Sequence, residues 1–207
     1  MSPESRVRTP LTRTRIIEAA LRLVDSEGLD GLSMRRLGEA LGVDPMAVYY
    51  HVPNKAALHD GILEHLWGGV VLPPPQPDET WQEVLAAVFR DFRRRLLDHP
   101  RAVTLAGTRS SVSSPMLRLV DDTLGRLVRA GLAPRDAMEL LDCLTAYTIG
   151  KTLAEAIAAP GAAVPPALAA LTAESHPQVV AAMADGYGFA PDAEFERGLA
   201  ALIAGWA

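Results

Sequence analysis

The segment 45–51, PMAVYYH, places two tyrosines and a histidine beside small and apolar side chains. Hydroxyl and imidazole groups donate hydrogen bonds to phosphate oxygens, and small side chains let a helix approach base edges. The alternative is a local core cluster, because large side chains on short helices often pack against their neighbours. The residue types therefore leave two interpretations open for this segment, DNA contact and core packing.

Residues capable of catalysis or metal binding occur elsewhere, but without the spacing that these activities need. Gly150-Lys151-Thr152 imitates the end of a phosphate-binding loop, yet no glycine stands five residues before Gly150 and no strand leads into the trio. The five histidines have no HExxH spacing and no cysteine partners. Because Cys143 is the single cysteine, no intramolecular disulfide can form, and its side chain is expected to pack in an apolar helix. An enzyme is therefore the disfavoured alternative, and no cofactor is expected.

Capping residues predict the helices that carry the segment 45–51. Ser33 is suited to cap a helix over residues 34–41, which Gly42 ends with the left-handed conformation that a tight turn needs. Asp44 is suited to cap the next helix, with Pro45 in its first position, where a missing N–H costs nothing. These two short helices, packed around the turn, predict a helix-turn-helix motif over about residues 34–53.

The flanking sequence predicts one helix before this motif and another after it. An apolar stripe from Leu11 to Val24 precedes Gly28, and Asn54 is suited to cap a helix that continues to residue 71. The proline-rich run LPPPQPDE follows and is the best domain boundary in the chain. We therefore expect a DNA-binding domain over residues 11–71 and a second domain over residues 78–207.

The composition predicts an all-α fold, because Ala, Leu and Arg dominate and runs of strand-forming residues are scarce. The net charge of −5 hides a basic end, since residues 1–24 carry five Arg against two Glu. Such a patch, rather than the total charge, is what DNA contact requires. The absence of a signal-like or membrane-spanning apolar run indicates a cytoplasmic protein without a membrane partner. The predominance of Arg over Lys suggests a bacterium with a GC-rich genome.

The segment 12–63, from TRTRIIEAAL to AALHDGIL, resembles the DNA-binding domain of the tetracycline repressor (TetR) family. The matching features are GLDGLSMRRLGEALGV, the aromatic pair in VYYHV and the Asn54-Lys55 start of the next helix. TWQEVLAAVFRDFRRRLLDHP, LVRAGLAPRDAMELLDCLTAYTIG and FERGLAALIAG resemble the regulatory C-terminal domain of the same family. The resemblance implies an Ω-shaped homodimer, a palindromic operator in double-stranded DNA, and release from it when a small molecule binds.

The resemblance assigns DNA-contacting roles to residues of the helix-turn-helix. Arg35 lies at the start of the scaffold helix, and Tyr49 and His51 match residues that contact the DNA backbone. Lys55 matches a lysine that reaches a phosphate, and this role explains a cation at a helix start, where the helix dipole disfavours it. For Tyr50, packing against the scaffold is as good an interpretation as contact. The residues expected at DNA are Met34, Arg35, Pro45, Met46, Ala47, Tyr49, Tyr50, His51 and Lys55.

The resemblance also predicts a ligand cavity, in which Phe92 lies against the bound molecule. For the apolar members of the set, simple core packing is the alternative. Asp142 differs, because a carboxylate within a long apolar helix needs either a polar ligand or a partner such as Arg109 or Arg118. The residues expected to face the cavity are Trp67, Phe92, Leu105, Thr108, Val120, Thr123, Met138, Leu141, Asp142 and Thr145.

Three positions depart from the tetracycline repressor where that protein binds its magnesium–drug chelate. Leu105, Ala154 and Val71 stand where oxygen or imidazole ligands would be needed. Magnesium-bound tetracycline is therefore not the expected effector. An apolar or aromatic molecule with one polar group is expected instead.

The segments 134–159 and 192–206 are expected to form a four-helix dimer interface. Small residues allow close approach of two helices, and an apolar stripe on the second segment is one that a monomer would leave exposed. The residues expected at this interface are Ala154, Ala158, Phe195, Leu199, Leu202 and Ile203. The remaining alternative is a ligand-independent DNA-binding or interaction protein of the same fold, whose cavity would be filled by its own side chains.

Overall fold

The computed structural model describes residues 10–109, 112–157, 166–188 and 190–206, and every regular element in these ranges is helical. This confirms the all-α prediction. The helices are α1 (Arg13–Glu27), α2 (Met34–Leu41), α3 (Pro45–His51), α4 (Lys55–Gly68), α5 (Trp81–Asp98), the 3₁₀ helix η1 (Pro100–Ala102), α6 (Val103–Thr108), α7 (Ser114–Arg129), α8 (Pro134–Ile157), α9 (Pro166–Ala169), α10 (Pro177–Ala184) and α11 (Pro191–Ala204).

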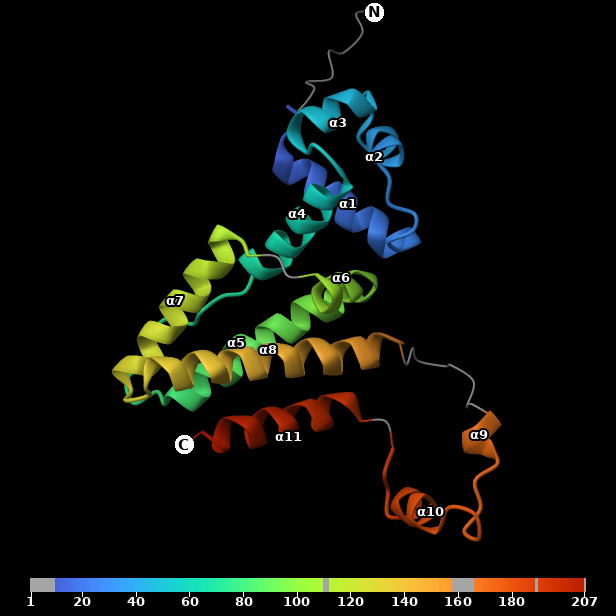
Figure 1. Ribbon diagram of the computed structural model, residues 1–207, viewed down its shortest axis with the longest axis vertical. Coiled ribbons are helices and arrows are strands. Elements are labelled where there is room, and N and C mark those ends of the chain that lie inside the picture. The colour runs from blue at the N-terminus through green and yellow to red at the C-terminus, as the bar shows by residue number, and fades with distance from the viewer. Residues whose placement is uncertain (1–9, 110–111, 158–165, 189, 207) are drawn as a thin grey trace, which may run out of the picture.

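Helices α1 to α3 and the start of α4 form a small head at one end of the molecule, and α5 to α8 with α11 form a larger body (Figure 1). Helix α4 runs from the head to the body, and α9 and α10 lie apart from both. None of the helices in the described ranges is long and apolar enough to cross a membrane.

The local signals in the head produce the helices that the sequence predicts. The side chain of Ser33 accepts a hydrogen bond from the backbone N–H of Arg36 at 3.3 Å, and Asp44 accepts one from Met46 at 2.7 Å. Gly42 adopts the left-handed conformation, with φ of 67°, in the turn between α2 and α3. The helix-turn-helix is confirmed at the level of caps and turn.

Helix α4 begins as predicted but ends earlier. Asn54 Oδ1 accepts a hydrogen bond from the backbone N–H of Ala57 at 2.8 Å, whereas the last helical residue is Gly68 and not residue 71. The two glycines Gly68 and Gly69 lower the helix propensity at this point. Gly61 lets α4 lie directly on α1, because a Cβ atom there would overlap the side chain of Ile17.

The body is organised around α8, which packs against α5, α6, α7 and α11. Helix α5 starts with a capping box, in which Thr80 Oγ1 accepts from the N–H of Glu83 and the Glu83 carboxylate accepts from the N–H of Thr80. Helix α7 is capped by Ser113, whose side chain accepts a hydrogen bond from the N–H of Met116 at 3.3 Å. Pro115 is tolerated in the first turn because no N–H there has an intrahelical partner.

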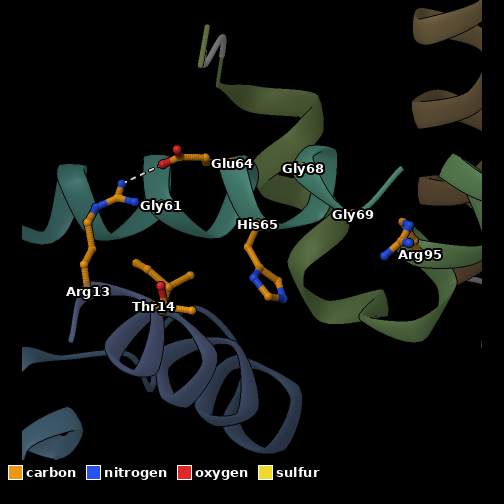
Figure 2. A pocket seen from close by; sticks show the side chains of 9 residues that line it. Arg13, Thr14, Gly61, Glu64, His65, Gly68, Gly69 and Arg95 are labelled. Atoms are coloured by element: carbon orange, nitrogen blue, oxygen red, sulfur yellow. Dashed lines mark ion pairs between the residues drawn. The ribbon is translucent and has the colours of Figure 1, made fainter. Parts of the chain in front are cut away.

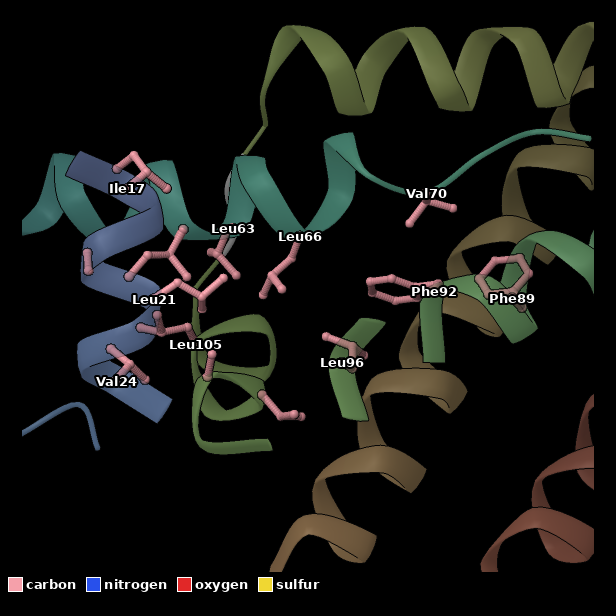
Figure 3. Packing of buried hydrophobic residues seen from close by; sticks show 14 of the residues in the cluster. Ile17, Leu21, Val24, Leu63, Leu66, Val70, Phe89, Phe92, Leu96 and Leu105 are labelled. Atoms are coloured by element: carbon pink, nitrogen blue, oxygen red, sulfur yellow. The ribbon is translucent and has the colours of Figure 1, made fainter. Parts of the chain in front are cut away.

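The buried side chains form one core that continues from the head into the body (Figure 3). Leu63, Leu66 and Val70 carry it from α4 towards Phe92 and Leu96 of α5, and each of these residues is buried. Because head and body share a core, a shift of α4 in the body must also move the head.

Helix α11 is part of the core of its own chain, which corrects the expectation for its apolar stripe. Phe195 and Leu199 are 1% exposed and Ile203 is 5% exposed, because α11 packs on α5 and α8. A monomer therefore does not leave these three side chains exposed. Of the other residues expected at a dimer interface, Leu202 is half-buried and Ala154 is exposed. Ala158 lies outside the described residues.

Ion pairs fasten α11 to the body on both sides of its buried stripe. Arg90 binds Glu196 through two nitrogens, with the shortest distance 2.6 Å, and Lys151 binds Glu194. Arg93 binds Asp192 at 2.7 Å and also lies over the ring of Phe195 at 4.8 Å. These contacts hold α11 in one register against α5 and α8.

Candidate DNA-binding surface and ligand cavity

Helix α3 presents one face to the core and the opposite face to solvent. Val48 is fully buried, whereas Met46 is 71%, Tyr49 42% and Tyr50 88% exposed. Residues three and four positions apart share a helix face, so Met46, Tyr49 and Tyr50 form one outward surface. Tyr50 also makes an edge-to-face contact with His51 at 5.3 Å. The 88% exposure of the Tyr50 side chain excludes its packing against the scaffold helix.

The scaffold helix α2 supplies one exposed cation and one buried side chain. The side chain of Arg35 is 79% exposed and lies 3.6 Å from Glu39. Met34 is 7% exposed and belongs to the core, so its side chain does not face DNA as expected. The correction follows from the helix period, because Met34 and Leu37 are three residues apart and both point inward.

Lys55 is exposed at the first position of α4, directly after the head's two short helices. Its Nζ atom lies 3.5 Å from the backbone carbonyl oxygen of Leu29. One long hydrogen bond to a carbonyl leaves the charge uncompensated, so the ammonium group keeps its capacity to bind a phosphate. Pro45 and Ala47 are half-buried at the start of α3 and allow its N-terminal end to approach another surface closely.

A second site is an apolar cavity between α4, α5, α7 and α8, with a volume of about 90 Å³. The indole ring of Trp67 stacks on the ring of Phe92 at 3.9 Å with an interplanar angle of 18°, and both rings line the cavity. Its lining contains eight of the ten residues that the sequence predicts there: Trp67, Phe92, Val120, Thr123, Met138, Leu141, Asp142 and Thr145.

Four further lining residues were missed in the sequence analysis, namely Val88, Phe89, Met116 and Leu119. The signal for all four was the helix period. Val88 and Phe89 precede Phe92 by four and three residues, Met116 precedes Val120 by four, and Leu119 precedes Thr123 by four, so they share the faces of residues that were predicted.

Leu105 and Thr108 do not line this cavity, contrary to expectation. Leu105 is 3% exposed and belongs to the buried cluster that also contains Leu21 and Val24 of α1. Thr108 is exposed, and its hydroxyl donates a hydrogen bond to the carbonyl oxygen of Thr104 at 2.7 Å. The reason is that α6 lies beneath the head and contributes to the junction with it rather than to the cavity wall.

The polar groups of the cavity differ in what they can offer a ligand. Thr123 is 1% exposed, and its hydroxyl already donates to the carbonyl oxygen of Leu119 at 2.7 Å. Asp142 is exposed rather than buried and makes no ion pair within the described ranges. Arg109, its expected partner, binds Asp60 at 2.9 Å instead. The carboxylate of Asp142 is therefore an accessible hydrogen-bond acceptor at the edge of the cavity.

The chain matches two protein families over most of its length. Residues 16–62 match the family described as bacterial regulatory proteins, tetR family. Residues 73–207 match the family described as Tetracyclin repressor-like, C-terminal domain. The chain belongs to the tetracycline repressor (TetR) family. Membership places it among regulators of transcription, the class that the sequence analysis favoured over an enzyme.

Individual members of the TetR family match over almost the whole chain. The tetracycline repressor protein class A from transposon 1721 of Escherichia coli is 34% identical, covering 96% of this chain and 92% of that protein. The ActR protein of Streptomyces coelicolor, solved in complex with actinorhodin, has a TM-score of 0.82 and 31% identity, covering 96% of this chain and 97% of that one. A single-substitution variant of TetR from Acinetobacter baumannii AYE, solved in complex with minocycline, has a TM-score of 0.73 and 26% identity over 95% of this chain and 97% of that one.

This TetR-family chain is accordingly a ligand-responsive DNA-binding regulator.

Polar contacts, as well as the shared core, join the head to the body. His99 Nδ1 lies 2.8 Å from Asp25 Oδ2, and Arg101 donates to the carbonyl oxygen of Ser26 at 2.6 Å. Together with Arg109 and Asp60, these contacts connect α1 and α4 to the region between α5 and α7.

Cys143 is exposed on α8, which corrects the expectation that it packs in the core.

Proposed function

We propose that this regulator is a homodimeric repressor that binds a two-fold symmetric operator through α3 and leaves it when a small aromatic molecule enters the cavity. In this proposal residues 11–71 form the DNA-binding domain and residues 78–207 the regulatory and dimerisation domain. The observation that carries it is the stack of Trp67 on Phe92. Trp67 belongs to the helix that carries the head, so a ligand beside it acts directly on the DNA-reading part.

The size of the cavity supports coupling between ligand and DNA. A volume of about 90 Å³ is well below the roughly 300–1,000 Å³ typical of small-molecule sites. A drug-sized ligand must therefore push apart the side chains that line the cavity. Displacement of Trp67 from Phe92 moves α4 relative to α5, and the head follows α4.

The lining supports a flat aromatic effector that carries a hydrogen-bond donor or a positive charge. Aromatic and aliphatic side chains surround most of the cavity, and the carboxylate of Asp142 accepts but does not donate. The first two molecules to test are actinorhodin, which was solved bound to ActR, and minocycline, which was solved bound to a TetR variant. Magnesium chelation is not part of the proposal, because Leu105 and Ala154 lack oxygen and imidazole groups.

The dimer is proposed to form through the exposed face of α8, where Ala154 permits close approach, together with Leu202 of α11. In a dimer with two-fold symmetry, the two copies of α3 must lie about 34–36 Å apart to read successive major grooves. A monomeric mass in light scattering at micromolar concentration would contradict the proposed dimer.

We place the action of this regulator in the bacterial cytoplasm, where DNA is accessible.

The decisive experiment selects bound sequences from a pool of random duplex DNA and then tests their release. We expect enrichment of a palindrome, and release of that DNA by actinorhodin or minocycline. Asp142→Asn should weaken binding of whichever probe acts while leaving DNA affinity unchanged, since α8, which carries Asp142, lies in the body and apart from α3 (Figure 1). If no DNA sequence were enriched, the proposed repressor would be contradicted. If neither probe released the selected DNA, the proposed class of effector would be contradicted.

A further inference from the structure

A carboxylate of α5 accepts a hydrogen bond from the backbone that follows α4. The N–H of Val70 closes the helix end by donating to the carbonyl oxygen of Trp67 at 3.0 Å. The next amide, that of Val71, donates instead to Asp91 Oδ2 at 3.1 Å. The same oxygen accepts a hydrogen bond from Arg95 Nε at 3.1 Å. Asp91 therefore joins the end of α4 to α5 through the backbone, whatever side chain stands at position 71.

Arg95 adds a steric contact to this hydrogen-bonded one. Its guanidinium group lies against Gly69, so closely that a Cβ atom on Gly69 would overlap it. The side chains of Asp91 and Arg95 are 21% and 28% exposed. Burial raises the pKa of Asp91, but hydrogen bonds from Arg94, Val71 and Arg95 outweigh it and hold this pKa below its ordinary value. Asp91 is thus a carboxylate at neutral pH.

This contact borders two different environments. The Trp67–Phe92 stack of the ligand cavity is close in sequence, since Trp67 stands two residues before Gly69 and Phe92 one residue after Asp91. Arg95 and Gly69 also line an open cleft of about 340 Å³ next to the head, whose other lining residues include Arg13, Thr14 and Glu64 (Figure 2). The cleft leaves α4 room to move, whereas the contact of Asp91 and Arg95 with segment 69–71 does not.

We propose that Asp91 and Arg95 are positioning residues, which fix segment 69–71 on α5 as the point about which α4 turns. They determine the orientation of the head on the body, and they convert a displacement of Trp67 into a rotation of the head. A free segment would instead absorb the displacement locally. This inference rests on the proposed coupling between cavity and DNA, but it concerns residues that touch neither the cavity nor the DNA.

The first test measures amide hydrogen exchange in the ligand-free protein. Asp91→Ala removes the acceptor of the Val71 N–H, so exchange of this amide should become about tenfold faster, the effect of losing one hydrogen bond. Arg94→Ala is the matched control, because Arg94 binds the other oxygen of the same carboxylate and is 59% exposed. Equal exchange of Val71 in Asp91→Ala and in the unaltered protein would overturn the proposal.

The second test is a double-mutant cycle on affinity for the selected DNA. Trp67→Leu disturbs the stack without a ligand, and its effect should be transmitted only where segment 69–71 is fixed. The combined Trp67→Leu and Asp91→Ala variant should therefore differ from the product of the single effects by about tenfold, whereas Trp67→Leu with Arg94→Ala should be additive. Additivity in both cycles would overturn the proposal.

The two tests separate this inference from the proposed function. Neither test uses a ligand, so failure of actinorhodin and minocycline to release DNA contradicts the effector class alone. Hydrogen exchange also needs no DNA, so it decides whether segment 69–71 is held by Asp91 even if no palindrome is selected.

Discussion

The hydroxyl group of Tyr147 on α8 occupies the space into which a side chain on Gly198 of α11 would extend. Its single O–H is shared between the backbone carbonyl oxygens of Glu194 and Phe195, each at 3.1 Å. Gly198 is therefore required by the close approach of two helices, and not by an unusual backbone conformation.

Gly198→Ala should lower the free energy of unfolding by about 1–3 kcal/mol, because the added methyl group displaces Tyr147 from a packed position. Denaturant titration followed by circular dichroism measures this change. Gly125→Ala is the matched control, since Gly125 lies in α7 with open space around it. Alanine there should leave stability unchanged or raise it by up to about 1 kcal/mol. A loss at Gly125 equal to that at Gly198 would contradict the packing argument.

Lys55→Ala should weaken binding to all DNA sequences alike and reduce the slope of log affinity against log salt by about 0.9, the value for one phosphate contact. Titrations at several salt concentrations against selected and random duplexes measure both effects. Tyr49→Ala should weaken binding with a smaller change in slope, because its contact is neutral. If Lys55→Ala instead altered the preferred bases at fixed salt, Lys55 would be reading sequence.

Phe92→Leu should abolish the release of DNA that the effector causes. Leucine removes the ring stacked on Trp67 but keeps most of the buried volume. Alanine is less suitable, since Phe92 is fully buried and its truncation costs about 3–5 kcal/mol. DNA affinity measured with and without the active probe tests this prediction, and intact release in Phe92→Leu would show that the stack does not transmit binding.

Acid should loosen α11 from the body. Hydrogen bonds from Arg90 lower the pKa of Glu196, and those from Lys151 lower the pKa of Glu194, from ordinary values near 4.5. A carboxylate whose pKa is lower in the folded state contributes stability that is fully present above its unfolded pKa and is lost as the pH falls through the folded one. Melting temperature should therefore drop below about pH 4.5.

Glu196→Gln isolates one of these contributions. The variant should be slightly less stable at neutral pH, by at most about 1 kcal/mol for a half-exposed pair, and should lose less stability on acidification. Thermal melts of both proteins between pH 3 and pH 7 make the comparison, with the pH range chosen around the ordinary glutamate pKa. Parallel curves for the two proteins would show that the Arg90–Glu196 pair does not contribute.

The sequence by itself determined the elements of the head. Ser33, Asp44 and Asn54 each bind an amide two or three residues away, so the information that starts each helix is local. The resemblance placed Tyr49 among the DNA-contacting residues, and its side chain is exposed. The lining of the cavity could be predicted to the same extent, because the resemblance supplied Phe92 and Val120 as reference positions on their helices.

Only the tertiary structure decided which neighbour each apolar or charged face meets. The stripe of Phe195 and Leu199 is equally suited to a partner chain and to α5 and α8, and burial within the chain follows from helix crossings that no local pattern encodes. The same holds for Leu105, which lies under the head, and for Asp142, which is exposed. The bond between Asp91 and the amide of Val71 joins residues twenty positions apart in sequence, and it exists because α5 passes the end of α4 at this point.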